Sequence, residues 1–105
     1  MENKRQFTRI PYKEAVQFRT QGQFEPEACT ACDISEGGMR LNSFRFIPLK
    51  EKIALTLQFD VFNPIDIQGQ VVWVQRVPHS EYYQIGLAFE PQASLKELQE
   101  YIESH

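Results

Sequence analysis

The sequence predicts an all-β domain, a closed antiparallel barrel that ends in a short α-helix. Three observations predict it. Apolar and polar residues alternate along most of the 105-residue chain, as in strands with one buried face. Turn signals separate these runs at intervals of roughly 8–15 residues, which is typical of barrels. Helical spacing of apolar residues occurs in one segment, near the C-terminus. A chain of this length is expected to form one domain.

The first 60 residues contain two clear strand signals. Val16 and Phe18 alternate with polar residues ahead of a turn at Gln21-Gly22. Over residues 52–60 the alternation is clearest, because every second residue is large and apolar while those between are small or polar. The predicted core face of this strand consists of Ile53, Leu55, Leu57 and Phe59.

A long strand over residues 65–73 follows the turn at Asn63-Pro64. Its predicted core face consists of Ile65, Ile67, Val71 and Trp73. Trp73 is therefore expected to pack in the core. The alternative for Trp73 is an exposed platform on which a base stacks.

The last two predicted elements are a strand over residues 82–89 and a helix over residues 94–104. In the strand, Tyr83, Ile85, Leu87 and Phe89 share a face. Ser94-Leu95-Lys96-Glu97 then fits a capping box, in which the Ser94 hydroxyl bonds the backbone N–H of Glu97. Apolar residues recur at helical spacing from Leu95 to Ile102. We therefore expect an amphipathic helix packed across one opening or edge of the barrel.

Charge is unevenly distributed on a chain whose net charge is −3. That balance argues against a general nucleic-acid binder, which is usually basic throughout. Residues 1–19 nevertheless carry five basic residues against Glu2 and Glu14, which suits a small, discrete anion. No apolar run approaches the ~20 residues of a membrane span, and the polar N-terminus does not resemble a signal peptide. We expect a cytoplasmic protein without membrane insertion.

Cys29 and Cys32 form a C-x-x-C pair, for which a metal or redox site is one interpretation. A zinc site normally needs four ligands, and His79 and His105 lie far along the chain. Residues three apart in a strand also point to opposite faces. We therefore expect no metal, and two buried thiols in a reducing compartment.

Two motifs stand out against this background. Arg5-Gln6-Phe7-Thr8-Arg9 reads R-x-x-x-R, and Asp33-Ile34-Ser35-Glu36-Gly37-Gly38 reads D-x-S-x-x-G. In that order they resemble the cyclic di-GMP-binding signature of PilZ domains. Residues 69–73 and 85–89 are similar to the later G-x-V-x-W and I-G-L-x-F strands of that family.

The resemblance runs from about residue 4 to residue 90 and implies both a fold and a division of the chain. The implied fold is a six-stranded antiparallel PilZ-like β-barrel with a short C-terminal α-helix. Residues 1–12 are then a flexible lead-in that carries R-x-x-x-R, residues 13–90 the barrel, and residues 94–104 the helix.

Arg5 and Arg9 are the expected cationic ligands of the nucleotide. A guanidinium bonds bidentately to a phosphate or to O6 and N7 of guanine, and its flat face stacks on a base. Pro11 disfavours helical geometry at Ile10, and so disfavours the alternative of two arginines on a solvated helix face. For Lys4, the resemblance implies that a cation favours an intercalated pair of cyclic di-GMP molecules, but lysine cannot stack as arginine does, so stoichiometry stays open.

Asp33, Ser35 and Gly38 are the expected ligands from the second motif. Alternation puts Asp33 and Ser35 on the same outward face, with Cys32 and Ile34 on the other. Asp33 can accept hydrogen bonds from guanine or hold an arginine, and Ser35 can bond a phosphate or a base edge. Glycine permits positive φ and close approach of the ligand. The alternative for this segment is an ordinary Asx-type turn.

The resemblance implies a receptor that is not an enzyme. Cyclic di-GMP would change the N-terminal conformation, and a partner protein in motility, exopolysaccharide or secretion machinery would respond. The alternative is a ligand-independent PilZ-like adaptor. No cofactor is expected besides this ligand. A single-stranded nucleic acid is not expected as a partner, since that function needs exposed aromatics along a basic groove. Spacing also suggests no nucleophile with a histidine and an acid.

Overall fold

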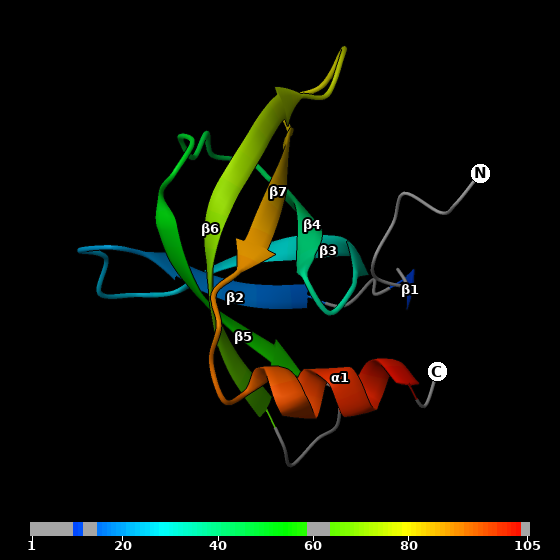
Figure 1. Ribbon diagram of the computed structural model, residues 1–105. Coiled ribbons are helices and arrows are strands. Elements are labelled where there is room, and N and C mark those ends of the chain that lie inside the picture. Colours follow the sequence, from blue (N-terminus) through cyan, green and yellow to red (C-terminus); the bar gives the residue numbers. More distant parts are fainter. Residues whose placement is uncertain (1–9, 12–14, 59–63, 104–105) are drawn as a thin grey trace.

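The structure is a computed structural model, and it describes residues 10–11, 15–58 and 64–103. These residues form seven strands of one sheet and one helix (Figure 1). In chain order they are β1 (Ile10–Pro11), β2 (Ala15–Thr20), β3 (Glu27–Ile34), β4 (Gly38–Ser43), β5 (Lys52–Gln58), β6 (Pro64–Arg76), β7 (Tyr83–Phe89) and α1 (Leu95–Glu103).

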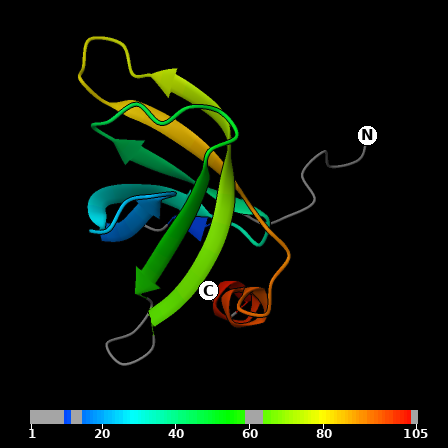
Figure 2. The same ribbon diagram turned by 90° about the vertical axis from the view of Figure 1, so that its left-hand side faces the viewer.

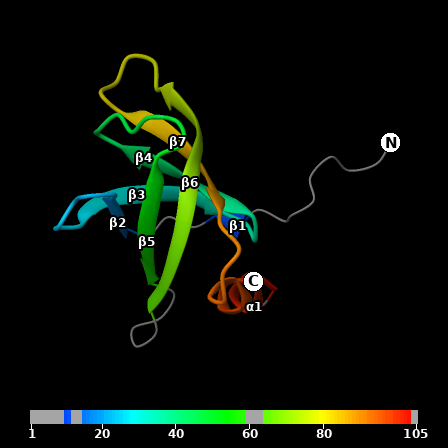
Figure 3. The same ribbon diagram turned by 60° about the vertical axis from the view of Figure 1, so that its left-hand side comes forward.

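Six of these strands close into a barrel. The order is β3-β2-β5-β6-β7-β4, and β4 pairs again with β3, with all pairings antiparallel. Figures 2 and 3 show the long β6 curving along the whole height of the barrel. β1 lies outside this ring and pairs with the end of β3, beyond β2. The predicted six-stranded antiparallel barrel with a C-terminal helix is confirmed.

Alternation fills the barrel as the sequence predicts wherever strand pairing is regular. In β5, Ile53, Leu55 and Leu57 are at most 2% exposed, while Ala54 between them faces solvent. Phe59, the fourth residue of that predicted face, lies outside the described residues. The other strands contribute the buried apolar side chains Val16, Phe18, Cys29, Ala31, Ile34, Met39, Leu41, Ile65, Ile67, Val71, Ile85 and Leu87.

A β-bulge in β6 reverses the predicted orientation of Trp73. Val71 pairs with Leu87 but Trp73 pairs with Gly86, the neighbouring residue of β7, so Val72 is an extra residue. One inserted residue exchanges the inner and outer faces of everything that follows it. Trp73 is consequently 36% exposed, whereas Val71 is 1% exposed. The prediction that Trp73 packs in the core is wrong for this reason.

A second bulge lies in β3, where the pairing with β4 shifts between Ala31 and Asp33. Cys32 is the extra residue here. Its sulfur accepts a long hydrogen bond of 3.8 Å from Nε2 of Gln84, and its side chain is half-buried, whereas Ile34 is fully buried. The expectation that Cys32 and Ile34 share one face is therefore wrong, because the bulge breaks the alternation between them.

The helix packs across the end of the barrel at which β6 begins, in the lower part of Figures 1 and 3. Leu98 and Ile102 join the core at 0% and 5% exposure. The predicted capping box is wrong: the Ser94 hydroxyl donates to the carbonyl oxygen of Asp66 at 2.8 Å instead of bonding the Glu97 N–H. The helix start is thereby tied to β6. Among the described residues, no helix is long and apolar enough to cross a membrane.

Candidate functional site

Asp33 and Arg40 form an ion pair on the outer face of β3 and β4. They are direct cross-strand partners. Nε of Arg40 donates to Oδ2 of Asp33 at 2.8 Å, and Nη2 donates to the same oxygen. These hydrogen bonds raise the pKa of Arg40 above its usual value, so the guanidinium stays charged. The Asp33 side chain is 12% exposed and the Arg40 side chain 41%. The carboxylate is held in place while much of the guanidinium faces solvent.

The Ser35 hydroxyl closes the turn between β3 and β4. The backbone N–H of Ser35 donates to the carbonyl oxygen of Gly38 at 2.8 Å. The hydroxyl donates to that oxygen at 3.3 Å and accepts from the N–H of Gly37 at 3.2 Å. Ser35 is only 3% exposed. The expectation that it stands on an outward strand face beside Asp33 is wrong, because β3 ends at Ile34 and the turn draws the hydroxyl inward.

Gly38 is required by the packing of two strands. A Cβ at this position would overlap the carbonyl oxygen of Leu87 and lie 3.1 Å from its carbonyl carbon. Its φ is not positive, and among the described glycines only Gly22 has a positive φ. The positive φ that glycine was expected to permit in this turn is therefore not used at Gly37 or Gly38. The missing side chain of Gly38 instead lets β4 approach β7.

Trp73, Gly86, Arg40 and Asp33 form a row across the outer face, which we call the outer row. A Cβ at Gly86 would collide with the indole of Trp73, which lies directly over it. Gly86 pairs with Trp73 on one side and with Arg40 on the other, and Arg40 pairs with Asp33. Neighbouring strands lie about 4.8 Å apart, so the row spans about 14 Å. It brings together the partly exposed side chains of Trp73 and Arg40 and the largely buried carboxylate of Asp33.

β1 connects the two sequence motifs. Lys4, Arg5 and Arg9 lie outside the described residues. Ile10, the residue after Arg9, pairs with Ile34, and Pro11 pairs with Asp33. The strand that follows R-x-x-x-R in the sequence therefore lies directly beside the start of D-x-S-x-x-G.

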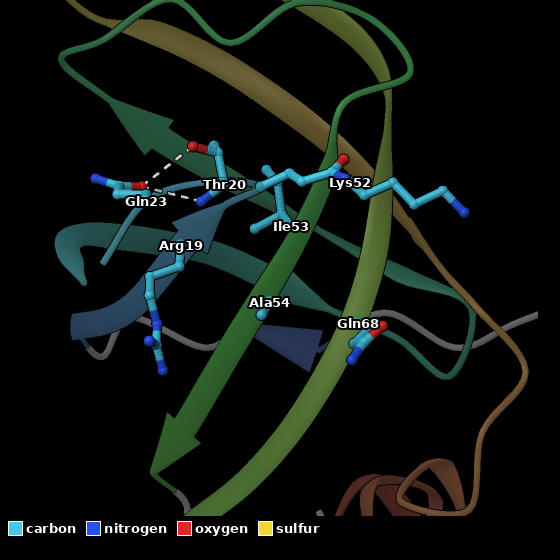
Figure 4. A pocket seen from close by; sticks show the side chains of 8 residues that line it. Arg19, Thr20, Gln23, Lys52, Ile53, Ala54 and Gln68 are labelled. Carbon is cyan, nitrogen blue, oxygen red and sulfur yellow. Dashed lines mark hydrogen bonds between the residues drawn. The ribbon is translucent and has the colours of Figure 1, made fainter. Parts of the chain in front are cut away.

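Two surface hollows lie on another part of the barrel. The first, of about 420 Å³, is drawn in Figure 4 and is lined by Arg19, Thr20, Gln21, Gln23, Lys52, Ile53, Ala54 and Gln68. The second, of about 290 Å³, adjoins it and shares Arg19, Ala54 and Gln68. Lys52 pairs with Glu90 at 2.9 Å, and Arg19 donates to the carbonyl of Phe24 at 3.2 Å. The cations of the first hollow are thus engaged, and neither hollow includes a predicted site residue.

Cys29 and Cys32 face different surroundings. Burial in the core, with smaller contributions from Glu27 and Cys32, raises the pKa of the Cys29 thiol to about 12. Cys32 is half-buried against Gln84. The prediction of a buried thiol thus holds for Cys29 but not fully for Cys32. Within the described residues, no group of three or more His, Cys, Asp or Glu side chains is placed to hold a metal ion.

Two members of the outer row, Arg40 and Gly86, were missed as site residues from the sequence, and a third, Trp73, was assigned to the core. Arg40 carried a usable signal, because a hairpin that turns at residues 35–38 pairs position 33 with position 40. Gly86 carried a weaker one, since a glycine inside a strand often marks a close approach. For Trp73 the sequence offered base stacking only as the alternative, because the strand signals do not place a bulge between Val71 and Trp73.

The chain is similar to PilZ domains in sequence and in structure. A family model described as PilZ domain matches residues 3–104. The structure of Bacillus subtilis inhibitor of motility MotI/DgrA has a TM-score of 0.77 and 20% identity, over 95% of this chain and 49% of that one. The PilZ domain of YcgR from Escherichia coli, with c-di-GMP, has a TM-score of 0.73 and 12% identity, over 95% and 88%. The K. pneumonia MrkH-c-di-GMP complex has a TM-score of 0.69 and 22% identity, over 98% and 51%.

These proteins differ from the present chain in length. It spans about half of the MotI/DgrA and MrkH chains but most of the YcgR domain. No curated protein matches it in sequence. At these identities the likeness to solved structures establishes the fold.

Proposed function

Because the chain belongs to the PilZ domain family, we propose that it is a cytoplasmic receptor for cyclic di-GMP and not an enzyme. The family match covers residues 3–104, which include both motifs. Related PilZ structures, those of YcgR, MrkH and PlzA, are described with c-di-GMP bound. For this chain, the proposal of cyclic di-GMP as ligand rests on the residues of the chain itself.

One observation carries the proposal: the pairing of β1 with the end of β3. Ile10 opposite Ile34 and Pro11 opposite Asp33 join the R-x-x-x-R segment to the D-x-S-x-x-G segment. This pairing supports the proposal that the arginines of one motif and the carboxylate of the other contact the same ligand. Cyclic di-GMP offers two phosphates and two guanines to such a set.

The roles of the residues follow from their chemistry. Arg5 and Arg9 bond phosphate oxygens or the O6 and N7 atoms of guanine. Asp33 accepts from a guanine edge while Arg40 holds it in place. Trp73 offers its exposed indole to a base at the other end of the outer row. Ser35 and Gly38 support this surface by shaping the turn, and a ligand contact to the Ser35 hydroxyl requires the turn to rearrange.

We further propose that the ligand changes the conformation of residues 1–10. Lys4, Arg5 and Arg9 carry like charges close together in the sequence, and their mutual repulsion is relieved when an anion binds. Ordering a segment on binding lowers the affinity but creates a surface that a partner protein can recognise. The effect on motility, exopolysaccharide or secretion machinery is then exerted through that partner. The positive charge of Lys4 influences whether one cyclic di-GMP molecule or an intercalated pair binds.

Isothermal titration with cyclic di-GMP, cyclic di-AMP and GTP tests the proposal. We expect cyclic di-GMP alone to bind, with a Kd on the order of micromolar, or about −8 kcal/mol. Arg5→Ala and Arg9→Ala should each weaken binding by about 1.5–3 kcal/mol, the size of a lost charge-assisted hydrogen bond. Arg19→Ala is the matched control and should bind as the wild type does, since Arg19 follows Phe18, which pairs with Glu27 at the opposite end of β3 from Asp33. If cyclic di-GMP gave no heat at several hundred micromolar, on the order of a hundred times the expected Kd, the ligand-independent adaptor would replace the receptor.

Amide hydrogen exchange separates binding from the conformational change. With cyclic di-GMP, protection should rise most in residues 4–10 and 33–38. N-terminal amides that already exchange slowly without ligand would contradict the conformational change while leaving the binding proposal intact.

A further inference from the structure

The loop between β4 and β5 contains a strained backbone at Lys50. Its φ is 71°, and among the described residues other than glycine only His79 also has a positive φ. The N–H of Glu51 donates to the carbonyl oxygen of Pro48 at 3.3 Å. Residues 48–51 therefore form a type II turn, with Lys50 at the position that normally takes glycine. A side chain in this left-handed conformation costs conformational free energy, so contacts elsewhere must hold it there.

The backbone of Val71 in β6 provides those contacts. The N–H of Lys50 donates to the carbonyl oxygen of Val71 at 2.8 Å, and the N–H of Val71 donates to the carbonyl oxygen of Glu51 at 3.0 Å. Two residues of the loop thus oppose one residue of β6, which is a β-bulge whose first residue is left-handed. Nε2 of Gln70 also donates to the carbonyl oxygen of Lys50 at 3.3 Å. We call the two backbone hydrogen bonds to Val71 the clasp.

The clasp lies where β6 separates from β5. β5 pairs with β6 as far as Lys52 opposite Gln70, whereas β6 continues to Arg76 (Figures 1 and 3). Among the described strands, only β7 pairs with β6 beyond Val71. In this part of the chain the clasp therefore closes the fork between β5 and β6.

Trp73 lies two residues beyond the clasp, on the far side of the bulge at Val72. Val71 is anchored in the core at 1% exposure. Trp73 is 36% exposed and lies over Gly86, so core packing does little to fix its position. Strand ladders open locally from their ends. Without the clasp, the fork between β5 and β6 would therefore open toward Trp73.

We propose that Lys50 is a positioning residue for the nucleotide site: its left-handed backbone forms the clasp, and the clasp holds Trp73 in the outer row. The side chain of Lys50 is exposed and plays no part in this role. The proposal rests on the proposed function, in which the indole of Trp73 offers a stacking surface to a base of cyclic di-GMP. A ring that is already in position loses less conformational freedom when the ligand binds.

Two substitutions of Lys50 test the proposal. Both remove the charge, so their comparison isolates the backbone. Lys50→Gly keeps the N–H and relieves the strain, whereas Lys50→Pro removes the N–H and fixes φ near about −65°, which breaks the clasp.

Trp73 is the single tryptophan of the chain, so its fluorescence reports the effect without any ligand. Lys50→Gly should keep the emission and acrylamide quenching of the wild type and should melt at or above the wild-type temperature. In Lys50→Pro the quenching constant should rise, by at most about threefold because Trp73 is already 36% exposed. Wild-type quenching in a folded Lys50→Pro variant would overturn the proposal.

Titration with cyclic di-GMP then tests whether the clasp acts through Trp73. Lys50→Gly should bind within about twofold of the wild type, and Lys50→Pro should bind about fivefold more weakly. In a Trp73→Ala background, Lys50→Pro should change the affinity by less than about twofold, because the ring that the clasp positions is gone. Equal losses with and without Trp73, or a loss in Lys50→Gly that matches the loss in Lys50→Pro, would contradict the proposal.

A further variant and the fluorescence readout keep the test decisive. If Lys50→Pro does not fold, Lys50→Val takes its place in both measurements, since a β-branched residue disfavours a positive φ. A wild type that does not bind cyclic di-GMP would contradict the proposed function. The fluorescence comparison would still decide whether the clasp positions Trp73.

Discussion

Gly38→Ala tests whether the glycine of D-x-S-x-x-G serves the fold or the ligand. The new methyl group would overlap the carbonyl oxygen of Leu87 and lie 3.4 Å from Cα of Ala88. Backbone atoms cannot rotate away as a side chain can, so β4 and β7 must separate at this point. The separation strains the pairing of Gly38 with Ala88 and the adjacent bond from the N–H of Phe89 to the carbonyl of Gly37, which measures 2.9 Å.

The magnitude follows from these contacts. Overpacking a well-packed site costs about 1–3 kcal/mol, and a weakened backbone hydrogen bond adds about 1 kcal/mol. We therefore expect Gly38→Ala to lower the free energy of unfolding by about 2–4 kcal/mol without ligand. For a domain of this size that lowers the melting temperature by about 10–20 °C.

Urea and thermal unfolding followed by circular dichroism measure the effect, with Gly22→Ala as the control. Gly22 has a φ of 85° but nothing within 4 Å of a new Cβ. The free energy of unfolding of that variant should therefore fall only by the backbone strain, about 1–2 kcal/mol. Gly38→Ala should be the less stable of the two. If Gly38→Ala melted with the wild type and lost only cyclic di-GMP binding, the glycine would serve the ligand and the packing argument would be refuted.

Three further predictions concern the thiols, the helix and the outer row. At pH 8, Ellman's reagent should modify Cys32 in the folded protein and Cys29 only on unfolding, because a thiol pKa of about 12 leaves about one molecule in ten thousand as thiolate; equal native rates would contradict this. Leu98→Ala should lower the free energy of unfolding in urea by about 2–4 kcal/mol, since Leu98 is 0% exposed; a loss below about 1 kcal/mol would mean that the helix is not part of the core. Gly86→Ala should displace the indole of Trp73, seen as a red-shifted tryptophan emission with a stability loss of about 1 kcal/mol or less, because the ring can move; unchanged emission would contradict the stacking of Trp73 on Gly86.

The sequence by itself determined the class of fold and the candidate ligand. Alternation in β5 placed Ile53, Leu55 and Leu57 in the core because a strand has a period of two and its pairing here has no irregularity. The two motifs indicated their ligand because they resemble the signature of PilZ domains, and their arginines and carboxylate suit its phosphates and guanines. Both kinds of information are local, so they can be read before the chain is folded.

Only the tertiary structure decided which way several of the informative side chains face. Trp73 lies outside the barrel because the registers of β6 and β7 differ by one residue after Val71. The Ser35 hydroxyl donates to the carbonyl oxygen of Gly38 within the β3–β4 turn. The Ser94 hydroxyl donates to the carbonyl oxygen of Asp66. A bulge depends on the partner strand as much as on its own sequence, and a hydroxyl bonds whichever group the packed elements bring within reach.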